Sequence, residues 1–296
     1  MPYTGEIAAL ATAMCWSLTS IIFTAAGKRI GALQVNLYRL PLAVLLLAVT
    51  YFSFWGDLHA PVSSVVWLGI SGIIGLAIGD TFLFQSMILV GARLSMVLLA
   101  LVPPITALLA FLFLGESINF LGIVGIGITV AGVMWVVAER TPDPSGIRKR
   151  ISLTGVFFGF MAAVGQAVGL IFAKKGLIPE MNSIFATLVR MFSALIVLWP
   201  ISLLLGRVKK PRRLFGTDSA ALKLMLVGVV FGPFLGVTLS LVSVKYTNTG
   251  IAATLMATVP VVMLPLVILI EKEKPTLRAV IGAAVAVAGV AIIFLR

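Results

Sequence analysis

The sequence predicts an all-α integral membrane protein with ten transmembrane helices, arranged as two inverted repeats of five helices each. Three observations predict this fold. Apolar runs extend along the whole chain, which is 60% hydrophobic and 11% charged, whereas a soluble domain has about 25% charged residues. The chain also repeats itself at a constant offset of 157 residues, and a polar segment at 139–151 separates five apolar runs from five others.

The internal repeat is clearest around the third and fourth apolar runs. The matched pairs include Gly79 and Gly236, Thr81 and Thr238, Ser86 and Ser243, Pro103 and Pro260, and Glu116 and Glu273, and the motif Val-Ala-Gly-Val at 130–133 recurs at 287–290. An ungapped match over this length indicates an internal duplication. We therefore predict a first repeat at 1–138, a polar linker at 139–151 and a second repeat at 152–296.

Each predicted span is long enough to cross a hydrocarbon layer of about 30 Å as a helix that rises about 1.5 Å per residue. In the first half the spans are Ile7–Ala26, Ala32–Phe54, Val65–Val90, Leu94–Leu114 and Asn119–Ala138. In the second half they are Ser152–Ala173, Asn182–Leu205, Leu224–Val244, Thr247–Ile270 and Ala279–Leu295. Because five is an odd number, the second half enters the membrane from the opposite side. Many secondary transporters have this inverted architecture and bind substrate near the midplane, where the halves meet.

Prolines interrupt two of the spans at matched positions. Pro103 and Pro104 lie in the middle of the fourth span, and Pro260 lies in the ninth. A proline inside a helix removes a backbone hydrogen bond, which a membrane helix tolerates where neighbours or a water-lined cavity satisfy the freed carbonyl. We therefore predict that these prolines break their helices at a central cavity and let each half rock.

Three charged residues interrupt the predicted spans. Arg39 lies in the second span, Asp80 in the third and Arg190 in the seventh, while the repeat places Val237 at the position equivalent to Asp80. An arginine inside the membrane costs about 2.5–3.5 kcal/mol on insertion scales, so each should face a partner or water, unless it snorkels to the nearer surface. Asp80 is expected to serve proton coupling or substrate binding, or else to pair with an arginine or lie near enough to the surface to stay solvated.

Polar side chains near the prolines are the candidates for a substrate cavity. They are Trp16, Ser20, Asp80, Thr81, Gln166, Thr238, Thr254 and Thr258. Thr254 and Thr258 are four residues apart and therefore share one helix face, as do Trp16 and Ser20. Their hydroxyls can bind a carboxylate or an amino group, although Ser and Thr also bond to the backbone of their own helix.

Several of these residues resemble the signature of the EamA-type repeat of the drug/metabolite transporter superfamily. The resemblance lies in Pro103 to Glu116 through A-L-L-A-F-L-F-L-G-E, in Trp16 with Ser17, and in Arg39. It covers essentially the whole chain as two tandem repeats. The second repeat departs from the pattern, since it reads I-L-I-E-K-E at 268–273 and has Gln166 near the place of Trp16. The resemblance implies a ten-helix transporter, because similar proteins export amino acids and other small metabolites, and some relatives exchange nucleotide sugars or sugar phosphates.

The sequence predicts no enzyme. There is no H-E-x-x-H motif, Walker A loop or cluster of Cys and His, so neither a metal nor a cofactor is expected. The lone His59 is expected at the surface. We predict a secondary transporter that exports small metabolites, amino acids first, by alternating access across the cytoplasmic membrane. The alternatives are a sugar-phosphate or nucleotide-sugar exchanger, which would need more than two buried arginines, and an ion channel or structural membrane protein.

The expected partners are a small-molecule substrate, membrane lipid and a coupling proton, and a monomer is expected to suffice. A net charge of +12 is also typical of proteins that bind nucleic acid. Here the basic residues lie in short loops between spans, so membrane topology explains them and no nucleic-acid partner is predicted.

The basic residues predict the orientation. On one side the loops hold Lys28, Arg29, Arg93, Arg140, Arg148, Lys149, Arg150, Arg207, Lys209, Lys210, Arg212, Arg213, Lys272, Lys274 and Arg278, which is 15 residues, and on the other Lys174, Lys175, Lys245 and Arg296, which is 4. The side richer in Lys and Arg normally faces the cytoplasm. Both termini are therefore predicted to be external, or periplasmic in a bacterial inner membrane.

The orientation can be tested by labelling single cysteines in a Cys15→Ser background. A cysteine placed between Glu139 and Arg150 should resist a membrane-impermeant maleimide in intact cells, because that linker is expected in the cytoplasm. A cysteine beside His59 should react. Labelling of the linker without labelling near His59 would reverse the predicted topology.

Overall fold

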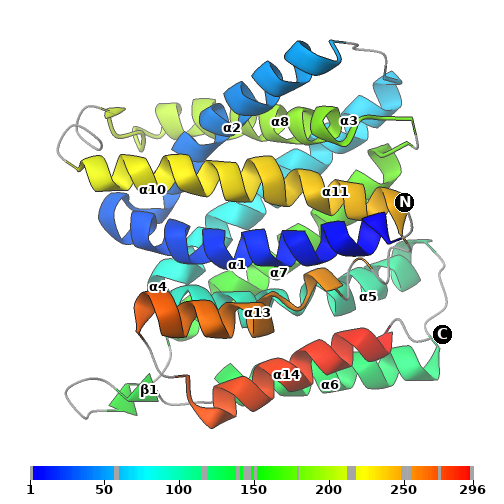
Figure 1. The fold of residues 1–296 in the computed structure, drawn as a ribbon, viewed down its shortest axis with the longest axis vertical. Coiled ribbons are helices and arrows are strands. Elements are labelled where there is room, and N and C mark those ends of the chain that lie inside the picture. The colour runs from blue at the N-terminus through cyan, green and yellow to red at the C-terminus, as the bar shows by residue number, and fades with distance from the viewer. Residues whose placement is uncertain are drawn as a thin grey trace.

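The computed structural model describes residues 3–56, 60–114, 119–137, 141–142, 148–149, 152–178, 180–211, 218–247, 252, 255–272 and 275–293. Within these ranges the chain is almost entirely helical, and helices such as α1 (Thr4–Ile30), α8 (Ser183–Leu204) and α10 (Ser219–Val229) run in nearly the same direction, while α2 (Ala32–Phe54) and α3 (Val62–Ser71) are tilted against them (Figure 1). Antiparallel pairing of β1 (Thr141–Pro142) with β2 (Arg148–Lys149) accounts for the described strands. The predicted all-α class is therefore confirmed for the described part of the chain.

The first half begins with α1 (Thr4–Ile30) and α2 (Ala32–Phe54), which meet at Gly31. There φ is 98°, a value that glycine adopts at little steric cost. The chain continues through α3 (Val62–Ser71), the π-helix η1 (Gly72–Gly79), α4 (Asp80–Leu99), α5 (Val102–Leu114) and α6 (Phe120–Val137). A second glycine with positive φ, Gly91 at 83°, interrupts α4 between the predicted third and fourth spans.

The second half consists of α7 (Leu153–Gly176), α8 (Ser183–Leu204), α10 (Ser219–Val229), the π-helix η2 (Val230–Gly236), α11 (Val237–Tyr246), α13 (Val259–Leu266), the π-helix η3 (Val267–Glu271) and α14 (Leu277–Ile293). Side-chain oxygens of Ser152, Asn182 and Asp218 cap the first turns of α7, α8 and α10 by accepting backbone N–H groups. Such caps satisfy donors that have no partner inside the helix.

Within the part of the chain that the structure describes, seven helical stretches are long and apolar enough to cross a membrane. They are Thr4–Ile30, Ala32–Phe54, Val62–Leu99, Phe120–Val137, Leu153–Gly176, Ser183–Leu204 and Ser219–Tyr246. The predicted fourth, ninth and tenth spans appear in the described residues as the shorter helices α5, α13 with η3, and α14. The described residues thus contain fewer long helices than the ten predicted. Helices α5 and α13 begin beside prolines, whereas α14 contains no proline and is 17 residues long.

The prolines start helices rather than kink them. Pro103 and Pro104 lie in the first turn of α5, directly after a turn at Ala100 and Leu101. Pro260 lies in the first turn of α13, after a turn at 257–258. The first residues of a helix have no N–H partner inside it, so a proline there costs no hydrogen bond. The expected interruption therefore occurs in both halves, about one turn before each proline.

The two halves pack against each other reciprocally. Helix α1 lies against α10, η2 and α11, and helix α7 lies against α3, η1 and α4. Glycines allow this approach, since a Cβ on Gly165 would lie 2.9 Å from the Cα of Gly79, and a Cβ on Gly236 would lie 2.8 Å from the indole of Trp16. The first helix of each half therefore packs on the third predicted span of the other half.

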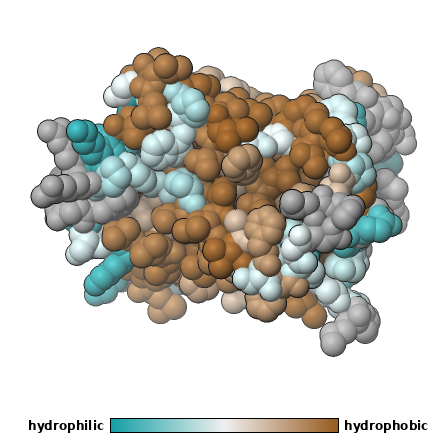
Figure 2. All heavy atoms as spheres, turned by 90° about the horizontal axis from the view of Figure 1, so that it is seen from above, coloured by the Kyte–Doolittle hydropathy of each residue, from teal (hydrophilic) through white to brown (hydrophobic). Residues whose placement is uncertain are grey.

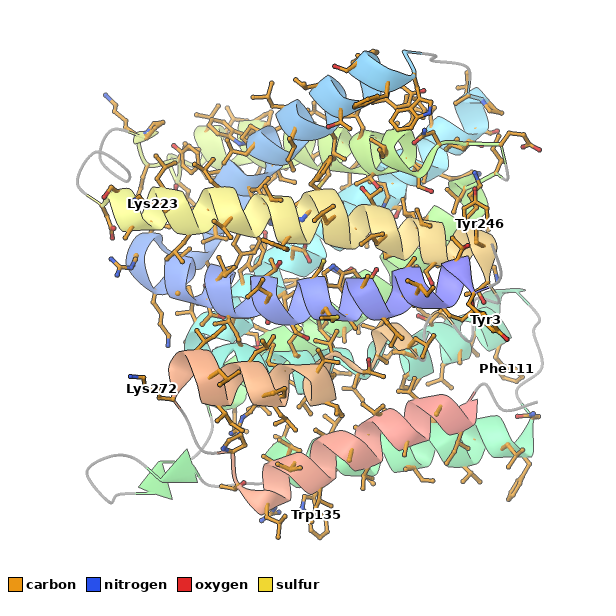
Figure 3. The ribbon with its side chains drawn as sticks, in the orientation of Figure 1. Tyr3, Phe111, Trp135, Lys223, Tyr246 and Lys272 are labelled. Atoms are coloured by element: carbon orange, nitrogen blue, oxygen red, sulfur yellow. The ribbon has the colours of Figure 1, made fainter. Side chains whose placement is uncertain are left out.

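The surface has the pattern of a membrane protein. Figure 2 shows a broad hydrophobic zone across the middle of the molecule, with hydrophilic residues at its two ends. Large apolar side chains such as Leu112, Trp135 and Leu204 are exposed. Lys223 and Lys272 lie at one end of the helices, whereas Tyr3 and Tyr246 lie at the other (Figure 3).

Helices α6 and α14 form a close pair at one edge of the bundle (Figure 1). A Cβ on Gly132 of α6 would lie 2.6 Å from the backbone nitrogen of Ala286 in α14, whereas a Cβ on the exposed Gly127 would meet nothing within 4 Å. Contact between backbones of this kind depends on small residues at the interface.

Gly132→Leu should therefore destabilise the protein, whereas Gly127→Leu should not. Forced overpacking typically costs about 1–3 kcal/mol, and both variants introduce the same side chain into the same helix. Thermal unfolding of the purified protein in detergent measures the difference. Equal midpoints for the two variants would contradict the close packing of α6 on α14.

Candidate functional site

The charged side chains that are buried among the described residues are Arg39, Asp80 and Arg190, on α2, α4 and α8. Their exposed fractions are 4%, 6% and 6%. Helix α2 packs on α4 and α8, and α8 packs on η1, which brings the three residues into one region. Burial of an ion without a partner is very costly, so the partners of each group decide what the site can do.

The π-helix η1 offers backbone carbonyls to this region. The Leu76 carbonyl accepts hydrogen bonds from Arg39 Nη2 at 3.1 Å and Asn36 Nδ2 at 3.2 Å, and the Ala77 carbonyl accepts one from Asn36 at 3.1 Å. Asn36 also donates to the Thr81 hydroxyl at 2.7 Å. A π-turn disturbs the regular pairing of helix carbonyls and is frequent at functional sites. Asn36 and Arg39 of α2 therefore donate hydrogen bonds to carbonyl groups of η1.

Asp80 pairs with Arg39. Arg39 Nη2 donates to Asp80 Oδ2, and Gln166 Nε2 donates to Asp80 Oδ1 at 2.5 Å and to the Gly75 carbonyl at 3.2 Å. Arg39 also donates through Nε to Asn36 Oδ1 at 2.9 Å, and its guanidinium lies 4.9 Å from the centre of the Phe84 ring. Both carboxylate oxygens and several guanidinium donors are therefore engaged. Because Gln166 belongs to α7, this network joins the two halves of the chain.

Arg190 is buried without such a network. Its Nε has no hydrogen-bond partner among the described residues, although its guanidinium is close enough to Asp80 to interact electrostatically with it. A Cβ on Gly75 would lie 3.7 Å from Arg190 Nη2 and 3.8 Å from Gln166 Oε1. Gly75 therefore lies directly against the guanidinium and has no side chain that would cover it. Gly72 allows α8 to approach, since a Cβ there would lie 2.0 Å from the Arg190 carbonyl.

The predicted cavity hydroxyls have different surroundings. Ser20 donates to the Ser17 carbonyl at 2.8 Å and Thr258 to the Leu255 carbonyl at 2.6 Å, so both bond to their own helix. Thr81 also donates to a carbonyl four residues earlier, that of Ala77 at 2.6 Å, but it accepts from Asn36 of α2 as well. Thr238 lies 3.5 Å from the hydroxyl of Thr187 on α8.

The remaining sequence candidates fall outside this network or outside the described residues. Trp16 packs on Gly236. Thr254 lies outside the described residues, as do His59, Glu116 and Glu273.

The sequence analysis missed Asn36 and Thr187. Asn36 is three residues before Arg39, and Thr187 is three residues before Arg190. Residues with this spacing lie on one face of a helix, so a search for polar neighbours of each intramembrane arginine would have found both. Asn36 contacts Thr81 just as Thr187 contacts Thr238, and Thr81 and Thr238 are a matched pair of the repeat. The two halves therefore present similar polar pairs.

Comparison with known proteins agrees with this architecture. Residues 3–138 and 153–295 match the model of the EamA-like transporter family. GDP-fucose transporter 1 of Nematostella vectensis is 27% identical over 158 residues, which cover 52% of this chain and 45% of the relative. GDP-fucose transporter 1 of Mus musculus is 27% identical over 143 residues, which cover 48% of this chain and 38% of the relative. The matched segments thus span less than half the length of these curated relatives. A crystal structure superimposes with a TM-score of 0.64 at 17% identity over 100% of this chain and 98% of its own, which supports the fold.

Removal of the Asp80 charge should destabilise the protein. Asp80→Asn leaves Arg39 without its counter-ion, and breaking a buried pair by removing one partner costs about 3–5 kcal/mol. The double variant Arg39→Gln/Asp80→Asn should be more stable than the sum of the two single variants implies, because no charge of the pair remains. Thermal unfolding in detergent of all four proteins measures this coupling, and strictly additive effects would contradict the pair.

Proposed function

Because the chain belongs to the EamA-like transporter family, we propose that it is a secondary transporter that moves small metabolites across a membrane by alternating access. The observation that carries the proposal is the buried network of Arg39, Asp80 and Gln166, with Arg190 beside it, since this network takes residues from both halves. In transporters built from inverted repeats, the substrate site lies near the midplane where the repeats meet. A conformational change that separates the halves would open such a site.

We further propose that the ten predicted spans form two inverted five-helix repeats, at 1–138 and 152–296, joined by the linker at 139–151. Three features support this arrangement. The π-helices η1 and η2 end at the matched glycines Gly79 and Gly236, turns precede Pro103 and Pro260 at matched positions, and α1 and α7 pack on equivalent elements of the opposite half. In this arrangement the fourth span is α5, the ninth is α13 with η3, and the tenth is α14.

The substrate class has two candidates. Export of amino acids follows from the small number of buried charges. Exchange of nucleotide sugars fits at least as well, because the similar proteins are GDP-fucose transporters. Both classes are organic molecules with an anionic group, and both need a polar site inside an apolar bundle. An ion channel or structural role is less well supported, because the family is one of transporters.

The membrane and the orientation remain proposals. We place the protein in a cytoplasmic membrane with both termini outside, on the basis of the 15-to-4 distribution of Lys and Arg in its loops. Proton coupling is proposed at Asp80, since an intramembrane carboxylate is a usual place for a proton relay.

The function is tested with purified protein in liposomes. Amino acids and nucleotide sugars are loaded on one side, and counterflow of the labelled compound is measured with and without an imposed pH gradient. Saturable counterflow of at least one class is expected, and a response to the gradient that Asp80→Asn abolishes would support coupling at that residue. A flux that increases linearly with concentration and never saturates would contradict a carrier mechanism.

The proposed hinge makes a separate prediction. Pro103→Ala/Pro260→Ala should let the helices continue through the turns before them, so transport should slow by about 10-fold or more while folding stays near normal, as is usual for changes at hinge positions. Pro200→Ala is the control, because Pro200 lies exposed inside α8 with no turn before it. If the double variant transports at the wild-type rate, the two prolines contribute only to packing and are not hinges.

A further inference from the structure

We infer that Arg190 binds the anionic group of the substrate, a carboxylate or a phosphate, and that Val237 keeps its guanidinium free to do so. The inference rests on the proposed transport function and deepens it, because it assigns the charge that the site selects. It follows from the balance of buried charge, from the comparison of the two repeats, and from the surroundings of the Arg190 guanidinium.

The buried charges of the described residues do not balance. Two guanidinium groups, Arg39 and Arg190, face one carboxylate, Asp80. Arg39 and Gln166 occupy the two oxygens of that carboxylate, whereas Nε of Arg190 has no hydrogen-bond partner among the described residues. One positive charge is therefore left without a direct counter-ion inside an apolar bundle. A ligand that carries one negative charge would compensate for it.

The repeat explains why this charge is unmatched. Arg39 lies with Asn36, Thr81 and Asp80 in the first half. Around Arg190 the second half has Thr187 and Thr238 at the corresponding places. In the first half Asp80 comes directly before Thr81. In the second half the residue directly before Thr238 is Val237, which is 8% exposed and has no charge. The first half thus neutralises its arginine with its own carboxylate, and the second half does not.

The guanidinium of Arg190 faces Gly75, a residue of η1 that has no side chain to cover it. A Cβ added at Gly75 would come into ordinary contact with both Arg190 Nη2, at 3.7 Å, and Gln166 Oε1, at 3.8 Å, so both groups border the same position. Guanidinium groups bind carboxylate and phosphate through two parallel hydrogen bonds. The Gln166 carbonyl oxygen cannot donate, so it would repel an anion but accept a hydrogen bond from an amino or hydroxyl group next to it. A substrate with an anionic group and a neighbouring donor fits these two residues.

The test uses pairs of probes in which one member has the anionic group and the other lacks it. Leucine is paired with leucinamide, and GDP with guanosine, and each is assayed by counterflow in proteoliposomes. Wild-type protein should move the member of one pair that carries the carboxylate or phosphate and not the member that lacks it. The pair that responds distinguishes a carboxylate from a phosphate as the bound group.

Val237→Asp should abolish this preference, because it gives Arg190 the carboxylate that Asp80 gives to Arg39. The expected loss of apparent affinity is about 10- to 100-fold, as for a lost charge-assisted hydrogen bond. Val237→Asn has nearly the same shape without the charge and should keep the preference for the anion. Unfolding midpoints in detergent establish that both variants are folded.

Substitution of the arginine is independent of the valine. Arg190→Lys should bind the anionic probe more weakly but still prefer it, and Arg190→Gln should lose the preference. If the wild-type protein moves its probe and neither Arg190→Gln nor Val237→Asp changes the preference, the inference is wrong while the proposed function stands. If the wild-type protein moves no member of either pair, the proposed function fails, and the inference with it.

Discussion

The structure depends on the need to satisfy polar groups where no water is available. In a bilayer an unpaired carbonyl or charge costs several kcal/mol, and η1 introduces both carbonyls with disturbed pairing and, at its end, Asp80. Asn36 and Arg39 of α2 satisfy Leu76, Ala77 and Asp80 together, so the position of α2 against α4 is fixed. Gln166 extends the same network to α7. One set of hydrogen bonds thereby determines how four elements are placed.

Much of the fold could be predicted from the sequence, because hydropathy and helix breakers determine it. Gly31 and Gly91 lie at predicted boundaries and have backbone angles that favour glycine. The turns before Pro103 and Pro260 lie where prolines end a helix. The lengths of the shorter helices α5 and α13 could not be predicted, since hydropathy does not say how much of an apolar run remains helical beside a proline.

The site was only partly predictable. Pairing of Asp80 with an arginine was one of three alternatives, beside a coupling or substrate-binding role and a solvated position near the surface. The sequence could not decide among them, because the geometry of η1 controls where the carboxylate lies. A π-helix has no hydropathy pattern of its own. The sequence therefore could not show that carbonyls of η1 accept side-chain hydrogen bonds, or that Asn36 donates them. A count of buried arginines also gave an incomplete picture of the substrate, because it did not consider which arginine already had a partner. The contrast between Arg39 and Arg190 appears only when their contacts are compared.

The matched π-helices η1 and η2 also have a consequence for the history of the chain. An α-helix turns by about 100° for each residue, so loss of one residue between Gly72 and Gly79 would rotate Asp80 away from Arg39 and carry every later side chain of α4 to another face. The segment can therefore tolerate substitutions during evolution, whereas deletion of a single residue would disrupt the site. The π-helix η2 lies at the same place in the second half as η1 in the first. Under the proposed duplication, the ancestral half-length protein therefore already had this π-helix before it was copied.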